Sequence, residues 1–141
     1  MPEGDLVFIV KAPMQSVWAL LSDMQKVGSC IPGCEVIVVD EKISNWKLAA
    51  KLGFVSRTFE LKNQVTELIP PTRSAWMAHG EDIEMAGSLD LASISNIETQ
   101  VHFRIVINAT GNMGKIINNV IDRKIDDYKN EFMKCVKSKL E

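Results

Sequence analysis

Hydrophobic and polar residues alternate along most of the middle of the chain, a pattern typical of strands with one buried face. The clearest case is the segment 100–110, in which one side carries Val101, Phe103, Ile105, Ile107 and Ala109. The same period of two predicts five further strands, at 5–11, 45–52, 55–66, 73–79 and 85–92, and the apolar run over 36–39 that follows Pro32-Gly33 predicts one more. The sequence therefore predicts seven strands in total.

Between the first two predicted strands, the apolar period changes to about 3.6, which indicates helix. Pro13 suits the first position of a short helix over 13–21. A second short helix is expected over Met24–Val27. Ser22 or Asp23 can cap its start, and Gly28 can supply the left-handed residue that ends it.

The longest regular pattern follows Gly114 and predicts one helix of about 25 residues. Its apolar stripe consists of Met113, Ile116, Ile117, Val120, Ile121, Ile125, Tyr128, Phe132 and Val136. Short connections between the strands imply an antiparallel sheet, because parallel strands need long crossovers. We therefore expect an α+β helix-grip fold, in which a curved sheet of about seven strands wraps around the carboxyl-terminal helix.

Length and composition narrow the possible functions. The 141 residues suit one domain over 1–141, and 46% hydrophobic residues with 24% charged residues are typical of a globular protein. The net charge of −2 argues against a nucleic-acid partner. The first residues are acidic and no apolar stretch reaches the ~18 residues of a membrane span, so we expect neither export nor more than peripheral membrane contact.

The three cysteines raise the question of metal or redox chemistry. Because their number is odd and Cys30 and Cys34 are close in sequence, we expect no disulfide framework. We therefore expect the protein to be located in the reducing cytoplasm. A zinc site needs four ligands, and the other candidates lie on distant predicted elements: Cys135, His79 and His102. We therefore interpret Cys30 and Cys34 as packing and turn residues around a left-handed Gly33, and expect no metal and no cofactor.

Two polar residues share the parity of buried positions in the strand 55–66. Arg57 and Asn63 would be costly in a dry core, so each must be paired or must line a wet cavity. They are the best sequence indication of a group that orients a ligand. The alternative is a β-bulge near Gly53 that turns Arg57 outward.

Bulky side chains from the predicted sheet and long helix converge on one interior. A filled core is their simplest explanation, yet seven methionines also suit an adaptable apolar pocket. For a pocket, the expected ligand-binding residues are Trp46, Phe54, Arg57, Phe59, Trp76, Met85, Phe103, Met113, Ile117 and Ile121.

Several short motifs together resemble those of the carbon monoxide dehydrogenase CoxG family, within the START and Bet v 1-like (SRPBCC) superfamily. They are Ala12-Pro13, Val17-Trp18, Leu20-Leu21-Ser22-Asp23 and Cys30-Ile31-Pro32-Gly33-Cys34. The resemblance continues more weakly in Lys51–Ser56, around Gly87 and in the closing helix. One departure is that the glycine-rich stretch usual in the family is reduced to Gly87.

The resemblance implies a helix-grip protein that holds an apolar molecule, such as a quinone or a lipid, and serves a molybdenum hydroxylase such as carbon monoxide dehydrogenase. It carries over no catalytic residues. A second hypothesis is an enzyme similar to polyketide cyclases or dehydratases, which would need two titratable groups inside, for example Arg57 with Glu81, Glu84 or Tyr128. A third is an interaction protein with a solid core.

Overall fold

A single seven-stranded sheet with three helices makes up the fold of the computed structural model, which describes residues 2–52 and 55–141. The side chains of Ala50, Leu52 and Val55 are outside this description. The elements follow in the order β1 (Glu3–Val10), α1 (Met14–Leu21), α2 (Met24–Ser29), β2 (Cys34–Val38), β3 (Ile43–Leu52), β4 (Val55–Ile69), β5 (Arg73–Gly80), β6 (Ile83–Ser95), β7 (Glu98–Ala109) and α3 (Gly114–Leu140).

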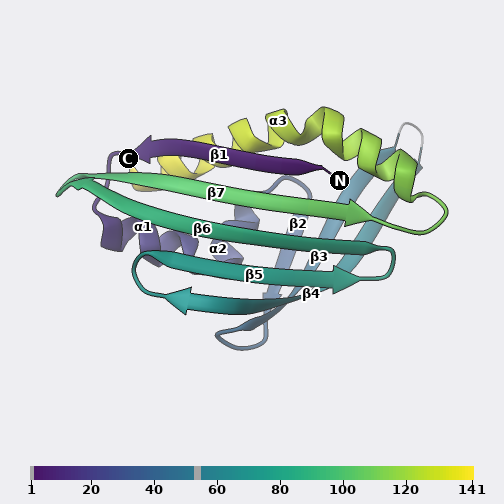
Figure 1. Cartoon of the computed structure of the whole chain (residues 1–141), viewed down its shortest axis with the longest axis horizontal. Coiled ribbons are helices and arrows are strands. Elements are labelled where there is room, and N and C mark those ends of the chain that lie inside the picture. Colours follow the sequence, from purple (N-terminus) through teal and green to yellow (C-terminus); the bar gives the residue numbers. More distant parts are fainter. Residues whose placement is uncertain (1, 53–54) are drawn as a thin grey trace.

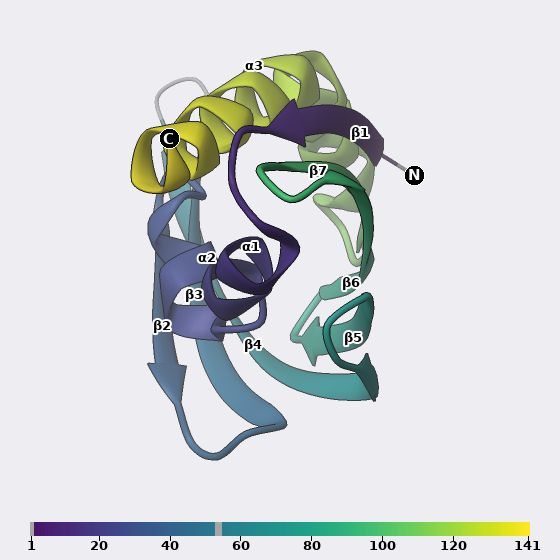
Figure 2. The same cartoon turned by 90° about the vertical axis from the view of Figure 1, so that its left-hand side faces the viewer.

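The sheet is antiparallel throughout, with the spatial order β1-β7-β6-β5-β4-β3-β2. It curves so strongly that β2 and β3 lie opposite β6 and β7, while α3 spans the open side (Figures 1 and 2). The two short helices fill one end of the interior (Figure 2). The predicted helix-grip arrangement is confirmed.

The two short helices form, but each differs from its prediction at one end. Helix α1 begins at Met14 and not at Pro13, because Pro13 has an extended backbone (φ −62°, ψ 148°) and is the cap residue before the helix. The Asp23 carboxylate caps α2, accepting hydrogen bonds from the backbone N–H groups of Gln25 (3.0 Å) and Lys26 (3.2 Å). The prediction that Gly28 ends this helix is wrong, because α2 continues to Ser29. A β-carbon at Gly28 would lie 2.3 Å from Cγ2 of Val36, so the glycine lets α2 approach β2.

Helix α3 is anchored to the sheet at both ends. Near its start, the Asn118 side chain accepts a hydrogen bond from Ala109 N–H (2.8 Å) and donates one to Ala109 C=O (3.0 Å). Near its end, Phe132 stacks on Phe103 of β7 with ring centroids 4.7 Å apart, and Val136 is fully buried. These contacts hold the apolar stripe of α3 over the concave face of the sheet.

The strand β4 contains a bulge, but not at the position considered in the sequence. Its pairing with β5 shifts between Val65 and Glu67, which changes the inward and outward alternation near the end of the strand. Gly53, where a bulge was the alternative expectation, lies outside the described residues. Up to Val65, the inward parity holds, and Phe59, Leu61 and Asn63 are all buried.

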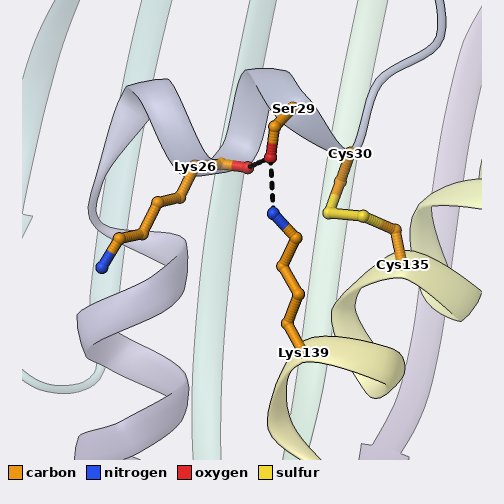
Figure 3. The surroundings of a disulfide bond; sticks show 5 residues. All are labelled: Lys26, Ser29, Cys30, Cys135 and Lys139. Carbon is orange, nitrogen blue, oxygen red and sulfur yellow. Dashed lines mark hydrogen bonds between the residues drawn. A yellow bond between two sulfur atoms is a disulfide. The ribbon is translucent and has the colours of Figure 1, made fainter.

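One expectation about the cysteines is wrong, because Cys30 and Cys135 form a disulfide. The bond joins the end of α2 to the last third of α3, and Lys139 Nζ donates a hydrogen bond to Ser29 Oγ (2.7 Å) beside it (Figure 3). The two cysteines are 105 residues apart in sequence, so no local spacing indicates the pair. The predicted location of the protein in a reducing cytoplasm was based on the expected absence of disulfides, so the cysteines no longer support it.

Candidate functional site

An apolar cavity of about 120 Å³ lies between the concave face of the sheet and α3. Its described walls come from five strands, the loop after α2 and one side of α3. They consist of Gly4, Leu6, Ile31, Pro32, Trp46, Leu48, Ala49, Phe59, Ile83, Met85, Phe103, Ile105, Ile107, Ile121, Ile125, Tyr128, Lys129 and Phe132. For comparison, an apolar cavity of about 150 Å³ holds one benzene molecule. The space therefore suits a ligand portion about one ring wide.

The structure brings half of the predicted ligand-binding residues to this cavity: Trp46, Phe59, Met85, Phe103 and Ile121. The strand residues among them sit on the inward parity of β3, β4, β6 and β7, as the alternation of the sequence predicts. They are therefore the candidate ligand contacts that sequence and structure share.

Four predicted contacts lie elsewhere, and one is outside the described residues. Trp76 (4% exposed) and Ile117 (0% exposed) pack in the core without lining the cavity. Met113 precedes the first turn of α3 and is 42% exposed, so it does not follow the helical stripe inward. Arg57 is also absent from the cavity wall, and Phe54 is the residue outside the description.

Arg57 is paired within the protein. Its Nη2 lies 3.1 Å from Oδ2 of Asp82 in the turn between β5 and β6, and its guanidinium carbon lies 4.5 Å from the centroid of the Phe59 ring. An ion pair and a cation–π contact together satisfy an arginine on the inward parity. The pairing removes the reason for treating Arg57 as a ligand-orienting group.

Asn63, the other polar residue on this parity, belongs to a small buried cluster. Its Nδ2 donates to Ser44 Oγ (3.3 Å), and the same hydroxyl oxygen accepts a hydrogen bond from Trp46 Nε1 (2.8 Å). Asn63 and Ser44 are almost fully buried and neither lines the cavity. The cluster therefore satisfies the indole N–H of Trp46, whose ring contributes to the wall.

Two wall residues with polar side chains were missing from the predicted set: Tyr128 and Lys129. Burial is the main cause that raises the pKa of the Tyr128 phenol, and the charges of Glu131 and Asp127 add to it. Lys129 Nζ lies 3.2 Å from Oδ1 of Asp126, one turn earlier in α3. The helical stripe in the sequence contains Tyr128 between Ile125 and Phe132, so it was the available signal for this residue, whereas Lys129 lies outside the stripe.

The remaining candidate chemistry is scattered over the fold. His79 is exposed, and His102 Nε2 lies 2.6 Å from Oδ1 of Asp5 on the outer face of the sheet. Burial, with a smaller effect of Glu35, raises the pKa of the Cys34 thiol to about 12, so the thiol stays protonated at neutral pH. Across residues 2–52 and 55–141, we find no cluster of three histidine, cysteine or acidic side chains able to hold a metal ion.

The outer face of the sheet has a second hollow, of about 490 Å³, which is more open than the first. Three of its four charged wall residues are in ion pairs: Arg73 contacts Glu67 (3.2 Å) and Asp90 (2.7 Å), and Arg104 contacts Asp5 (3.5 Å); Glu3 is the fourth. These pairs leave little charge to recognise a ligand. The inner cavity is therefore the better candidate site.

The helices give no sign of a membrane span. Within the described part of the chain, none of them is both long enough and apolar enough to cross a bilayer.

Solved structures with the same fold cover almost the whole chain. A conserved protein from Geobacillus kaustophilus is 20% identical with a TM-score of 0.79, covering 97% of this chain and 93% of its own. A START superfamily protein from Mycobacterium smegmatis is 9% identical with a TM-score of 0.69, covering 98% and 96%. The Zhui aromatase/cyclase from Streptomyces sp. R1128 is 15% identical with a TM-score of 0.64, covering 97% and 94%. At these identities, the likeness shows a START-like fold.

Sequence comparison is more specific than the fold. No curated protein matches the chain. The family model for CoxG, a subunit of carbon monoxide dehydrogenase, matches residues 7–141. This range includes all three helices, β2 to β7 and the second half of β1. The chain therefore belongs to the carbon monoxide dehydrogenase CoxG family.

Proposed function

We propose that this protein is a non-enzymatic binder of an apolar small molecule, quinone-like or lipid-like, and an accessory protein to a molybdenum hydroxylase such as carbon monoxide dehydrogenase. The observation that carries the proposal is the cavity between α3 and the sheet, whose wall is almost entirely aliphatic and aromatic. Such walls bind apolar molecules because burying apolar surface releases about 25 cal/mol per Å². The name of the family supports the accessory role.

A cavity-filling substitution tests the binding role. Ile121 lies on α3, is half-buried and lines the cavity, so Ile121→Trp would place a larger side chain in the space that a ligand needs. With tetramethyl-1,4-benzoquinone as the probe, we expect this variant to bind about tenfold more weakly than the wild type, because the indole takes the space of the probe. A tenfold change in the dissociation constant corresponds to about 1.4 kcal/mol. Isothermal titration calorimetry measures the two dissociation constants.

The same helix offers a matched control. Ile116 is 52% exposed and does not line the cavity, so Ile116→Trp adds the same side chain where no ligand is expected. This control should bind the probe like the wild type. Equal affinities of all three proteins, or no binding to the wild type, would rule out a quinone-like ligand in this cavity.

An enzyme of the cyclase type is the second candidate, because aromatase/cyclases share the fold. Its mechanism would require at least two titratable groups in the cavity. Of the four groups considered for it, Arg57 is paired with Asp82, Glu81 and Glu84 are exposed, and only Tyr128 lines the cavity. Lys129, which was not among the four, lines the cavity beside Tyr128, so two titratable groups are present. The otherwise aliphatic and aromatic wall favours binding over catalysis. Conversion of a linear polyketide precursor by the purified protein would reverse that preference.

A further inference from the structure

The polar groups of the cavity wall indicate which kind of apolar molecule fits best. Among the described wall residues, three side chains carry a nitrogen or oxygen atom: Trp46, Tyr128 and Lys129. The indole N–H of Trp46 is already used, because it donates to Ser44 Oγ at 2.8 Å. Tyr128 and Lys129, which follow one another in α3, are therefore the polar groups left for a ligand.

Both of these groups are hydrogen-bond donors. The raised pKa of Tyr128 means that its phenol keeps its proton at neutral pH, while its hydroxyl oxygen can also accept. The ammonium group of Lys129 has three N–H bonds and no acceptor. Its ion pair with Asp126 occupies one side of the group, and Asp126 itself is highly exposed and does not line the cavity.

The described wall contains no carboxylate or amide side chain that would accept hydrogen bonds from a ligand. A ligand group that only donates could use Tyr128 alone, and Lys129 would keep only its ion pair with Asp126. A carbonyl oxygen can accept from either residue or from both. Because one net hydrogen bond changes the affinity about three- to tenfold, the extra bond that an acceptor makes is large enough to select between ligands.

We propose that the cavity selects apolar molecules about one ring wide that carry a hydrogen-bond acceptor, such as a ring carbonyl, bound by Tyr128 and Lys129. This inference rests on the proposed binding function and narrows its ligand class. It assigns to the two residues a role in orientation and selectivity. The remaining wall supplies affinity without distinguishing one apolar ring from another.

The test uses two probes that differ at one position, acetophenone and ethylbenzene, where a carbonyl replaces a methylene group. Tyr128→Phe removes the hydroxyl and keeps the ring. We expect it to weaken acetophenone binding about three- to tenfold, the range for one net hydrogen bond, and to leave ethylbenzene binding unchanged. Titrations followed by amide chemical shifts of the labelled protein give both dissociation constants.

Lys129→Met extends the test to the second donor, with a similar loss expected for acetophenone alone. Lys124→Met is its control, since Lys124 is also half-buried on α3 but does not line the cavity. If both probes bind and neither Tyr128→Phe nor Lys129→Met changes their ratio, the acceptor selectivity is wrong while apolar binding stands. If neither probe binds the wild type, the proposed function itself fails.

Discussion

Loss of the Cys30–Cys135 disulfide is expected to lower the free energy of unfolding by about 4 kcal/mol. The bond closes a loop of 105 residues, and a crosslink over roughly 100 residues restricts the unfolded chain by about 4 to 5 kcal/mol in the chain-entropy model. For a domain of this size, the melting temperature should fall by roughly 15 °C. Urea unfolding of the oxidised protein, the reduced protein and Cys30→Ala/Cys135→Ala measures the change.

A substitution beside the disulfide separates the crosslink from the contacts around it. Lys139→Met removes the hydrogen bond to Ser29, which joins the same two helices at an exposed position (Figure 3). Surface changes of this kind alter stability by about 0.5 kcal/mol or less. If the reduced protein and the double alanine variant unfold at the same urea concentration as the oxidised protein, the disulfide makes no contribution to stability.

Gly87→Ala is expected to destabilise the protein by about 3 kcal/mol, the upper end of the usual range for an overpacked core. Gly87 pairs with Trp76 across β6 and β5, and a β-carbon there would lie 2.4 Å from Cε2 and Cζ2 of the indole. Trp76 cannot easily move aside, because it is 4% exposed and packs on Phe103 with ring centroids 5.6 Å apart. Denaturant unfolding followed by circular dichroism gives the loss.

The cause of this loss can be checked by making the partner smaller. Trp76→Phe removes the part of the indole that the new β-carbon would meet, so Gly87→Ala should cost less in a Trp76→Phe protein than in the wild type. Ser88→Ala, on the outer face next to Gly87, serves as the control and should change stability little. An equal cost of Gly87→Ala in both backgrounds would show that the clash with Trp76 is not the reason.

The elements of the fold could be predicted because each has a local cause. The alternation of Val101, Phe103 and Ile105 marks a half-buried strand, and the stripe from Ile117 to Val136 marks a helix with one buried side. The role expected of Gly28 was wrong for a non-local reason. The sequence does not distinguish a glycine that ends a helix from one that allows close packing. At Gly28, the nearby side chain of Val36 shows that close packing is the role.

The candidate site could be predicted only in part. Parity shows that Trp46 and Trp76 both point inward, yet only Trp46 lines the cavity. Trp76 instead fills the space that Gly87 leaves open on the next strand, which parity along a single strand does not reveal. Likewise, the ion pair of Arg57 with Asp82 joins β4 to the turn between β5 and β6, and the sheet as a whole sets the register that brings them together.

The sequence by itself determined the antiparallel sheet, the two short helices, the long closing helix and the family, because periodicity and short motifs depend on neighbouring residues. Only the tertiary structure decided which inward side chains leave a cavity, that Tyr128 and Lys129 reach its wall, and that Cys135 meets Cys30. These outcomes depend on how α3 crosses the curved sheet. Side chains from distant segments then either fill the space beneath the helix or leave it open.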